Sequence, residues 1–271
     1  MELIHDFPEH FQCIITSKRN IGKSFLARYL VYLLIKENPK RFSYIRVFSN
    51  TAHINGDWSF LPDEYVKKGF QDDVVQTILK FQEKKVVEGG QESAPSCLLI
   101  YDDVIGGRSD DMRYADSIDQ IFTQGRHYKI SSIFCMQYSK GIITPSMRSN
   151  TDVLFMGKSS SLSLEGFFEV VSSHPLFEKV ADLRKAMKKL DVGIKPYIDD
   201  KGKTRYEAKF LYFNNTSHAS PESQVRIIKA GKVPPSFRLK FPEKKGKKKT
   251  EKKEKKKGKE EEGAEKEDEF F

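Results

Sequence analysis

Short apolar runs alternate with longer amphipathic stretches along most of this chain. The short runs are rich in β-branched and aromatic residues, which predicts strands over Phe11–Thr16, Ser43–Phe48, Ser96–Tyr101, Ile130–Met136 and Thr151–Met156. In the longer stretches apolar residues recur at helical spacing, which predicts helices over Lys23–Lys36, Asp72–Val87, Tyr114–Thr123, Ser163–Val171 and Leu176–Leu190. Strands that alternate with helices favour an α/β fold, with a mostly parallel central sheet flanked by helices.

The pattern changes in the last third of the chain. Lys195–Ile198 and Tyr206–Phe213 predict a hairpin around an Asp-Asp-Lys-Gly turn. The periodicity then weakens, so we expect one folded domain over 1–213 and an irregular extension over 214–239. Residues 240–271 are a lysine-rich segment followed by an acidic one, and we expect this tail to be disordered because its composition cannot form a core.

Composition and charge narrow the function classes. The formal net charge of +9 favours anionic partners. No run of about eighteen apolar residues is present and the amino terminus lacks a signal-peptide layout, so we expect neither a membrane partner nor secretion. Three cysteines lie inside apolar runs without CxxC spacing, which favours buried thiols in a reducing, intracellular compartment: Cys13, Cys97 and Cys135.

The first candidate site is the segment between the first strand and the first helix. It matches the phosphate-loop pattern G-x-x-x-x-G-K-[ST] at three of four fixed positions, in the order Ser17, Lys18, Arg19, Asn20, Ile21, Gly22, Lys23, Ser24. Backbone N–H groups at a helix start attract phosphate. Lys23 is expected to reach the β- and γ-phosphates of ATP, and the Ser24 hydroxyl to ligate Mg²⁺. Ser17 stands where the pattern has Gly, so we expect a differently shaped loop entrance.

A pair of carboxylates supplies the second motif. Asp102 and Asp103 follow a buried strand directly, and ligands bind at the carboxyl edge of parallel sheets. Asp102 is expected to hold Mg²⁺ opposite Ser24, and Asp103 to orient and deprotonate the attacking water. Asp is also common in turns, so the pair gains its meaning from the phosphate loop. Two lower-ranked substitutes for the second acid are Asp110 and Asp111.

The segment that follows resembles a known family. Gly125-Arg126-His127 precedes the fourth strand, Gln137 ends it, and Arg148-Ser149-Asn150 comes later. Over about Phe11–Gly157 the chain resembles the FtsK/HerA superfamily, and more narrowly the poxvirus-type genome-packaging ATPases of large DNA viruses and virophages. The resemblance implies a RecA-like P-loop NTPase fold of the additional-strand type. It also implies a homo-oligomeric ring with sites at subunit interfaces, and a location at the virus assembly site or in the virion.

The resemblance also gives roles to individual residues. Gln137 is expected beside Asp102, where its amide contacts the γ-phosphate or the attacking water. Arg126 begins at the far edge of the sheet, so it is a candidate arginine finger for a neighbouring subunit, with Arg148 as the second candidate. A solvated surface arginine is the alternative for Arg126. We expect His127 to pack or hydrogen-bond rather than to catalyse. The second acid is often Glu in such motors, whereas this chain has Asp103.

The leading hypothesis is an ATPase that translocates double-stranded DNA into a capsid, with a capsid or portal protein as partner. Candidate DNA contacts are Arg108, Lys140, Lys67 and Lys68, together with the lysine-rich tail. One alternative is a DNA-processing motor or helicase of the same superfamily without a capsid. Another is a DNA or capsid tether that binds nucleotide without turnover, which only Ser17 favours.

Overall fold

The fold is taken from a computed structural model. It describes residue 4 and residues 7–104, 115–137, 143–159, 161–172, 177–189, 191–198, 202, 204–216 and 224–239. The predicted charged tail, the pore candidates Arg108 and Lys140, and the acids Asp110 and Asp111 lie outside the described residues.

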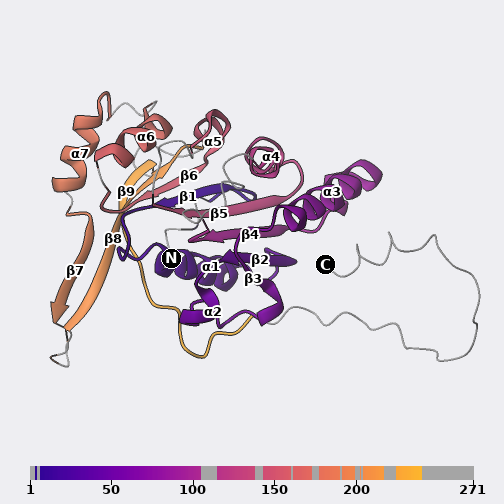
Figure 1. Ribbon diagram of the computed structural model, residues 1–271, viewed down its shortest axis with the longest axis horizontal. Coiled ribbons are helices and arrows are strands. Elements are labelled where there is room, and N and C mark those ends of the chain that lie inside the picture. The colour runs from indigo at the N-terminus through magenta and orange to yellow at the C-terminus, as the bar shows by residue number, and fades with distance from the viewer. Residues whose placement is uncertain are drawn as a thin grey trace, which may run out of the picture.

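One sheet organises this part of the chain (Figure 1). Its strands are β1 (Gln12–Thr16), β2 (Tyr44–Ser49), β3 (Val66–Lys68), β4 (Cys97–Asp102), β5 (Ile130–Met136), β6 (Val153–Met156), β7 (Gly193–Ile198), β8 (Thr204–Asn214) and β9 (Val225–Lys229). Within the described residues the nine strands follow the order β3-β2-β4-β5-β1-β6-β8-β7, and β9 pairs with β8. The strands from β3 to β6 are parallel, whereas β7, β8 and β9 pair antiparallel.

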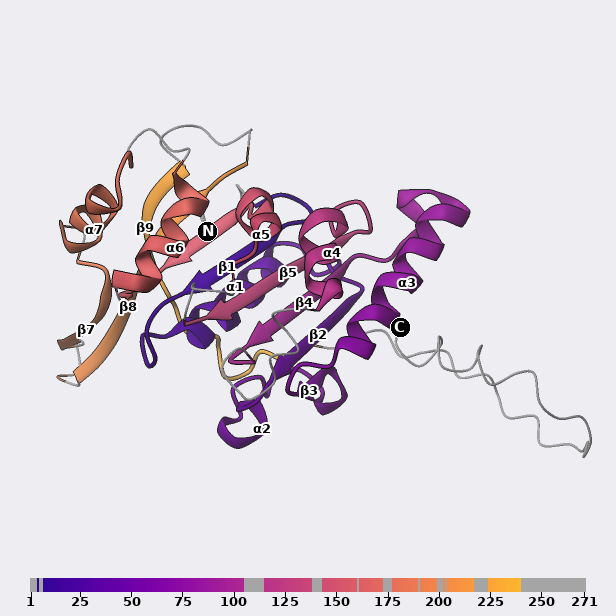
Figure 2. The same cartoon turned by 45° about the horizontal axis from the view of Figure 1, so that its top comes forward.

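Helices cover both faces of the sheet (Figures 1 and 2). They are α1 (Lys23–Glu37), α2 (Ala52–Asn55), α3 (Asp72–Gly89), α4 (Asp116–Gln124), α5 (Pro145–Asn150), α6 (Ser161–Val171) and α7 (Val180–Lys189), with 3-10 turns at Asp63–Tyr65 and Gln91–Ser93. Helix α1 buries Leu26 and Leu30 against one face. Helices α3 to α7 bury their apolar residues, such as Ile78 and Phe167, against the other. The result is a three-layer α/β domain, as the alternating pattern predicted.

The strand register brings the candidate chemistry to one edge. Thr16 of β1 pairs with Met136 of β5, while Asp102 of β4 pairs with Cys135 and with Ser49 of β2. Stacked rings hold β2, β4 and β5 together, because Tyr101 stacks on Phe134 at 4.2 Å and on Phe48 at 5.2 Å. The carboxyl ends of the central strands are therefore level at a single rigid edge.

The topology confirms the predicted fold class and identifies the additional strand. It is β5, which lies between the loop strand β1 and the acidic strand β4. The strand that comes between the two motifs in the sequence, β2, lies outside β4 instead. This arrangement places Gln137, the residue after β5, between the loop and the acids.

The carboxyl-terminal part of the described chain returns to the body of the domain. Residues 214–239, for which the sequence predicts an irregular extension, contain β9, and the backbone after β9 runs along α1. There Phe237 meets the Tyr32 ring edge-on at 5.0 Å, and the Leu239 N–H donates to the Phe60 carbonyl at 2.9 Å. The boundary at residue 213 stays a prediction.

Two further expectations concern the cysteines and membrane-spanning helices. All three cysteines are buried and free, as predicted, and burial raises the pKa of each thiol. Among the described residues, no helix combines the length and apolarity needed to cross a membrane.

Candidate nucleotide-binding site

The phosphate loop joins the end of β1 to the start of α1. Gly22 caps the helix with φ 95°, a left-handed conformation that favours glycine, and Asn20 is left-handed as well, with φ 61°. No side chain caps this helix start, so its first N–H groups are available to a ligand. A helix start of this kind is a site for phosphate oxygens.

The structure explains why Ser17 replaces glycine in this loop. Ser17 is fully buried and is not among the described residues with positive φ, so its side chain causes no backbone strain there. Its Cβ fits because the neighbouring residue at the end of β6 is Gly157. A Cβ at residue 157 would lie only 2.7 Å from the Ser17 Cβ. The loop entrance is therefore closely packed, with a glycine directly after the adjacent strand β6.

Lys23 lies under the loop with 7% of its surface exposed. Its ammonium donates to the carbonyl oxygens of Ser17 and Lys18, each at 3.2 Å. Burial lowers the pKa of Lys23, while the nearby Asp103 and Asp102 act in the opposite direction. The loop thus holds a buried cation where phosphate would bind.

Asp102 connects the loop to the acidic strand. The Ser24 hydroxyl donates to Asp102 Oδ1 at 2.6 Å, and the Trp58 indole N–H donates to Oδ2 at 2.9 Å. Burial raises the pKa of the Asp102 carboxyl, and these two hydrogen bonds offset part of the rise. The carboxylate is 1% exposed, so both its oxygens are fixed in orientation.

Asp103 and Gln137 meet beside this pair. Gln137 Nε2 donates to Asp103 Oδ1 at 3.1 Å, across the ends of β4 and β5. Asp103 has φ 56°, and its carbonyl accepts from Asn50 Nδ2 at 3.0 Å. The left-handed turn directs the Asp103 side chain into the cavity above the loop, so the second acid and the amide face the same space.

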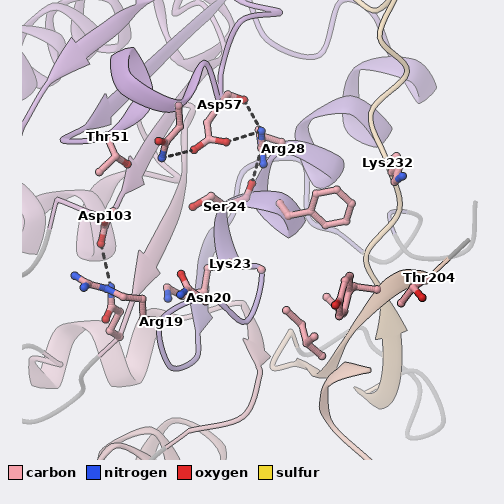
Figure 3. Close-up of a pocket in the computed structure, with 17 residues that line it drawn as sticks. Arg19, Asn20, Lys23, Ser24, Arg28, Thr51, Asp57, Asp103, Thr204 and Lys232 are labelled. Carbon is pink, nitrogen blue, oxygen red and sulfur yellow. Dashed lines mark hydrogen bonds and ion pairs between the residues drawn. The ribbon is translucent and has the colours of Figure 1, made fainter. Parts of the chain in front are cut away.

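These groups line one cavity of about 690 Å³ (Figure 3). Arg19, Asn20, Lys23 and Ser24 line it from the loop, and Asp103 and Gln137 from the sheet edge. It is completed by residues that the sequence did not identify as site residues: Phe25, Arg28, Thr51, Asn55, Asp57, Ile194, Thr204, Tyr206, Ala208 and Lys232.

Arg28 and Asp57 form an ion pair at 2.8 Å on one wall. Arg28 also donates to the Ser24 carbonyl at 3.1 Å, which connects the wall to the first turn of α1.

The arginine candidates lie at the opposite edge of the sheet. Arg126 Nη1 contacts Asp152 Oδ1 at 3.0 Å, and the other oxygen of Asp152 accepts from the Gln12 N–H at 2.8 Å. Arg148 pairs with Glu169 at 2.9 Å. Both arginines line a second cavity of about 620 Å³. Neither belongs to the phosphate-loop cavity of its own chain, as the sequence predicted for Arg126.

Three other residues singled out in the sequence line neither cavity. His127 is exposed in the turn between α4 and β5. Lys67 and Lys68 belong to β3 at the outer edge of the sheet, where Lys68 is exposed and Lys67 half-buried.

Sequence reasoning missed Trp58 and the β7–β8 hairpin as parts of the site. Trp58 is the single tryptophan of the chain and is 2% exposed, but its position between α2 and β3 gave no signal of contact with β4. The hairpin was predicted as an element, and its approach to the loop depends on the pairing of β8 with β6, which is not local.

Comparisons with known proteins agree with this architecture. No family model matches the chain. It is 26% identical over 152 residues to the uncharacterized protein L437 of Acanthamoeba polyphaga mimivirus, covering 54% of this chain and 51% of that protein. It is 27% identical over 146 residues to the uncharacterized protein 075L of Invertebrate iridescent virus 6, covering 53% and 52%. The chain therefore spans about half the length of the curated relatives it matches.

Among solved structures, the cytoplasmic domain of the type VII secretion ATPase EccC from Thermomonospora curvata matches with a TM-score of 0.54. The match is 12% identical and covers 83% of this chain and 26% of EccC. The chain therefore shares the fold of this domain of EccC. A second similar structure is the genome packaging NTPase B204 from Sulfolobus turreted icosahedral virus 2 in complex with ATP-gammaS, at TM-score 0.49 and 15% identity, covering 82% of this chain and 98% of B204.

Proposed function

We propose that this protein hydrolyses ATP and uses the energy to move double-stranded DNA, most specifically into a viral capsid. One observation carries the ATPase assignment. The two acids at the end of β4 have different partners. Asp102 accepts a hydrogen bond from Ser24 of the loop at 2.6 Å, and Asp103 accepts one from Gln137 at 3.1 Å. A phosphate-binding loop alone binds nucleotide, whereas a second carboxylate that faces the same cavity adds a base for water.

The chain's own residues supply most of the chemistry. The helix N-terminus and the Lys23 ammonium bind the phosphates and offset charge that develops on the γ-phosphoryl group. Asp103 accepts a proton from the attacking water. Gln137, which touches Asp103, orients that water and senses whether the γ-phosphate is present.

Ser24 and Asp102 fit Mg²⁺, which prefers oxygen ligands and is usually held by one or two carboxylates plus phosphate. Their oxygens lie 2.6 Å apart, and Trp58 holds the second Asp102 oxygen, so a single carboxylate oxygen faces the hydroxyl. When bound, the ion neutralises charge on the β- and γ-phosphates. The site residues proposed for ATP and Mg²⁺ are thus the loop from Ser17 to Ser24 together with Asp102.

The motor function requires neighbouring subunits. Arg126 and Arg148 line one cavity at the edge opposite the loop. A ring of identical chains in which this edge faces the next subunit's nucleotide is part of the proposal. We propose that Arg126 acts there in trans, with Arg148 as the second candidate. Lys67 and Lys68 are the described candidates for contact with DNA phosphates.

The likeness to viral proteins supports packaging over other DNA motors. Both curated relatives are viral proteins, and one similar solved structure is a genome packaging NTPase. A capsid or portal protein is the partner that this role requires.

The ATPase proposal is tested by turnover of Mg-ATP in the purified chain. Lys23→Ala is expected to lower turnover about 10²–10³-fold, because it removes the buried cation under the phosphates. Lys36→Ala, at the exposed far end of the same helix, is the matched control and should retain wild-type turnover. Equal turnover in wild type and Lys23→Ala would contradict the assignment.

Movement along DNA is tested by displacement of a third strand from a duplex, which is expected only with hydrolysable ATP. Packaging is tested by the presence of the chain in virions or its association with the capsid during assembly. ATP-driven displacement without either association would favour a DNA motor of another kind.

A further inference from the structure

The phosphate-loop cavity has two halves with different chemistry. Asp103, Thr51 and Arg19 lie on one side of the loop, and Thr204 and Lys232 lie on the other (Figure 3). The first half carries the groups for phosphate and water. The second half is built from the β7–β8 hairpin, the Phe25 side chain and the segment after β9.

Among the described residues of the hairpin, one face carries no charged side chain and is largely apolar. Residues directly opposite in an antiparallel pair share a face of the sheet, and on this face the pairs are Ile194–Ala208, Pro196–Tyr206 and Ile198–Thr204. Four of these six residues line the phosphate-loop cavity: Ile194, Thr204, Tyr206 and Ala208.

The opposite face of the hairpin is polar. Lys195 and Glu207 are paired there, and Glu207 forms ion pairs with Lys229 at 2.9 Å and with Lys209 at 3.5 Å. The hairpin thus has the pattern of an antiparallel sheet that packs one apolar face on the core and exposes one polar face to solvent. It keeps this pattern although it extends past the helices.

The apolar face continues the core on the α1 side of the sheet. Further along β8, Phe210 and Tyr212 are buried in the cluster that packs on α1. Toward the turn the same face carries Ala208, which is buried, and then Tyr206, which is 69% exposed. Helix α1 begins at Lys23, and among the described residues no helix covers the face beyond that point.

The phosphate loop touches this surface directly. A Cβ at Gly22 would lie 3.2 Å from the Ala208 Cβ, so β8 packs against the phosphate loop at the start of α1. A ligand whose phosphates bind at the α1 N-terminus therefore has its uncharged end beside Phe25 and Tyr206, inside the same cavity.

We propose that the apolar face of the β7–β8 hairpin is the subsite for the base of the nucleotide, with Tyr206 stacking on the base. This inference rests on the proposed function, because it assumes that the phosphates of ATP occupy the loop. A neutral aromatic ring fits a face without charged residues, and stacking on one tyrosine recognises the flat face of any base. The phosphate half gives the affinity for triphosphate, and the hairpin half adds the affinity for the nucleoside.

The test separates the two halves by calorimetric titration of the full chain with ATP-gammaS and with inorganic tripolyphosphate, both with Mg²⁺. Tyr206→Ala is expected to raise the Kd for ATP-gammaS about tenfold, the size of one lost stack, and to leave the Kd for tripolyphosphate within about twofold. Tyr206→Phe keeps the ring and should bind ATP-gammaS as wild type does.

The chain offers a matched control on the same hairpin. Tyr197 lies on the opposite face and is 51% exposed, so Tyr197→Ala removes a similar ring and should change neither Kd. Because both tyrosines are largely exposed, neither change is expected to unfold the protein.

Four results would overturn the base subsite. Tyr206→Ala with unchanged affinity for both ligands shows that the ring does not contact the base. An equal loss for both ligands shows a general distortion of the loop. Unchanged affinity together with a shift in oligomeric state assigns the face to a second copy of the chain. Wild-type protein that binds neither ligand would remove the proposed function itself, and the subsite with it.

Discussion

The two edges of the sheet hold similar residue types in different arrangements. At the carboxyl edge, Lys23, Asp103 and Gln137 converge on a cavity above a helix start. At the amino edge, Arg126 is paired with the buried Asp152, whose other oxygen holds the Gln12 N–H. At the carboxyl edge the charged groups face a cavity, whereas at the amino edge Arg126 and Asp152 pair with each other beside the strand ends.

Under the proposed function, this difference separates chemistry within a chain from chemistry between chains. The carboxyl edge brings together the groups that we propose bind triphosphate and position water. The amino edge contributes arginines that are distant from their own loop, and Arg126 keeps 47% of its side chain exposed despite its ion pair. A ring in which one edge faces the other would bring the two sets together.

The largest expected effect tests whether the two edges meet in a ring. Arg126→Ala should lower ATP turnover about 10³-fold or more if its guanidinium stabilises the transition state of a neighbouring subunit. Mixed with wild type, the variant should depress turnover below the value set by dilution. Linear dilution would contradict action in trans, and the same experiment with Arg148→Ala decides between the two arginines.

That substitution also removes the ion pair to Asp152, so stability must be measured beside activity. Burial raises the pKa of Asp152, and Arg126 and the Gln12 N–H offset part of this rise. A purely structural role predicts that the loss of turnover follows the loss of folded protein in thermal unfolding.

The next effect sharpens the assignment at the carboxyl edge. Asp103→Asn should lower turnover about 10²–10⁴-fold by removing the base, while ATP-gammaS binding stays within about twofold of wild type. The amide keeps the size of the side chain and an oxygen that accepts from Gln137. Turnover near the wild-type rate would assign the base to another group.

A smaller effect tests the packing of Ser17 against Gly157. Gly157→Ala places a methyl group 2.7 Å from the Ser17 Cβ and should raise the Kd for ATP-gammaS about tenfold. Adding Ser17→Gly removes the Ser17 Cβ and should recover part of the affinity. Recovery is incomplete because the new methyl group also lies 3.0 Å from the Phe210 ring. A double variant as weak as Gly157→Ala alone would show that Ser17 is not the critical contact.

The smallest effect concerns the stability cost of the buried acid. Asp102→Asn should stabilise the nucleotide-free fold by on the order of 1 kcal/mol at pH 7, seen as a melting temperature a few degrees higher, although turnover is lost. The pKa of Asp102 is raised in the fold. At pH values between the ordinary and the raised pKa, the unfolded chain therefore binds fewer protons than the folded chain. Wild-type stability falls as pH rises through that interval.

The variant lacks this titration. Its advantage over wild type should therefore shrink as pH is lowered through this interval and stay constant below about 3.9, the ordinary aspartate value. Thermal unfolding across pH measures the difference, and a variant less stable than wild type at neutral pH would contradict it.

Local patterns predicted most of the fold and the inner part of the site. Apart from the short elements α2, β3 and α5, which the sequence did not predict, the strands and helices from β1 to β6 follow from apolar patterns. The loop follows from residue types that phosphate binding requires in sequence order. Gln137 was predicted beside the acids, and the register of β4 with β5 places it there.

The missed parts depend on contacts between distant segments. Trp58 reaches Asp102 through the fold of the segment after α2, and Asp152 reaches Arg126 because β5 and β6 both flank β1. The sequence predicts a β7–β8 hairpin, but the pairing of β8 with β6 decides that its apolar face meets the phosphate loop.

ATP turnover by the purified chain, with and without duplex DNA, tests the central claim most directly. An ATP-driven DNA motor predicts measurable turnover that duplex DNA increases several-fold and that Lys23→Ala lowers about 10²–10³-fold under both conditions. Tight binding of ATP without turnover, whether or not DNA is present, would contradict the motor and leave a nucleotide-binding tether.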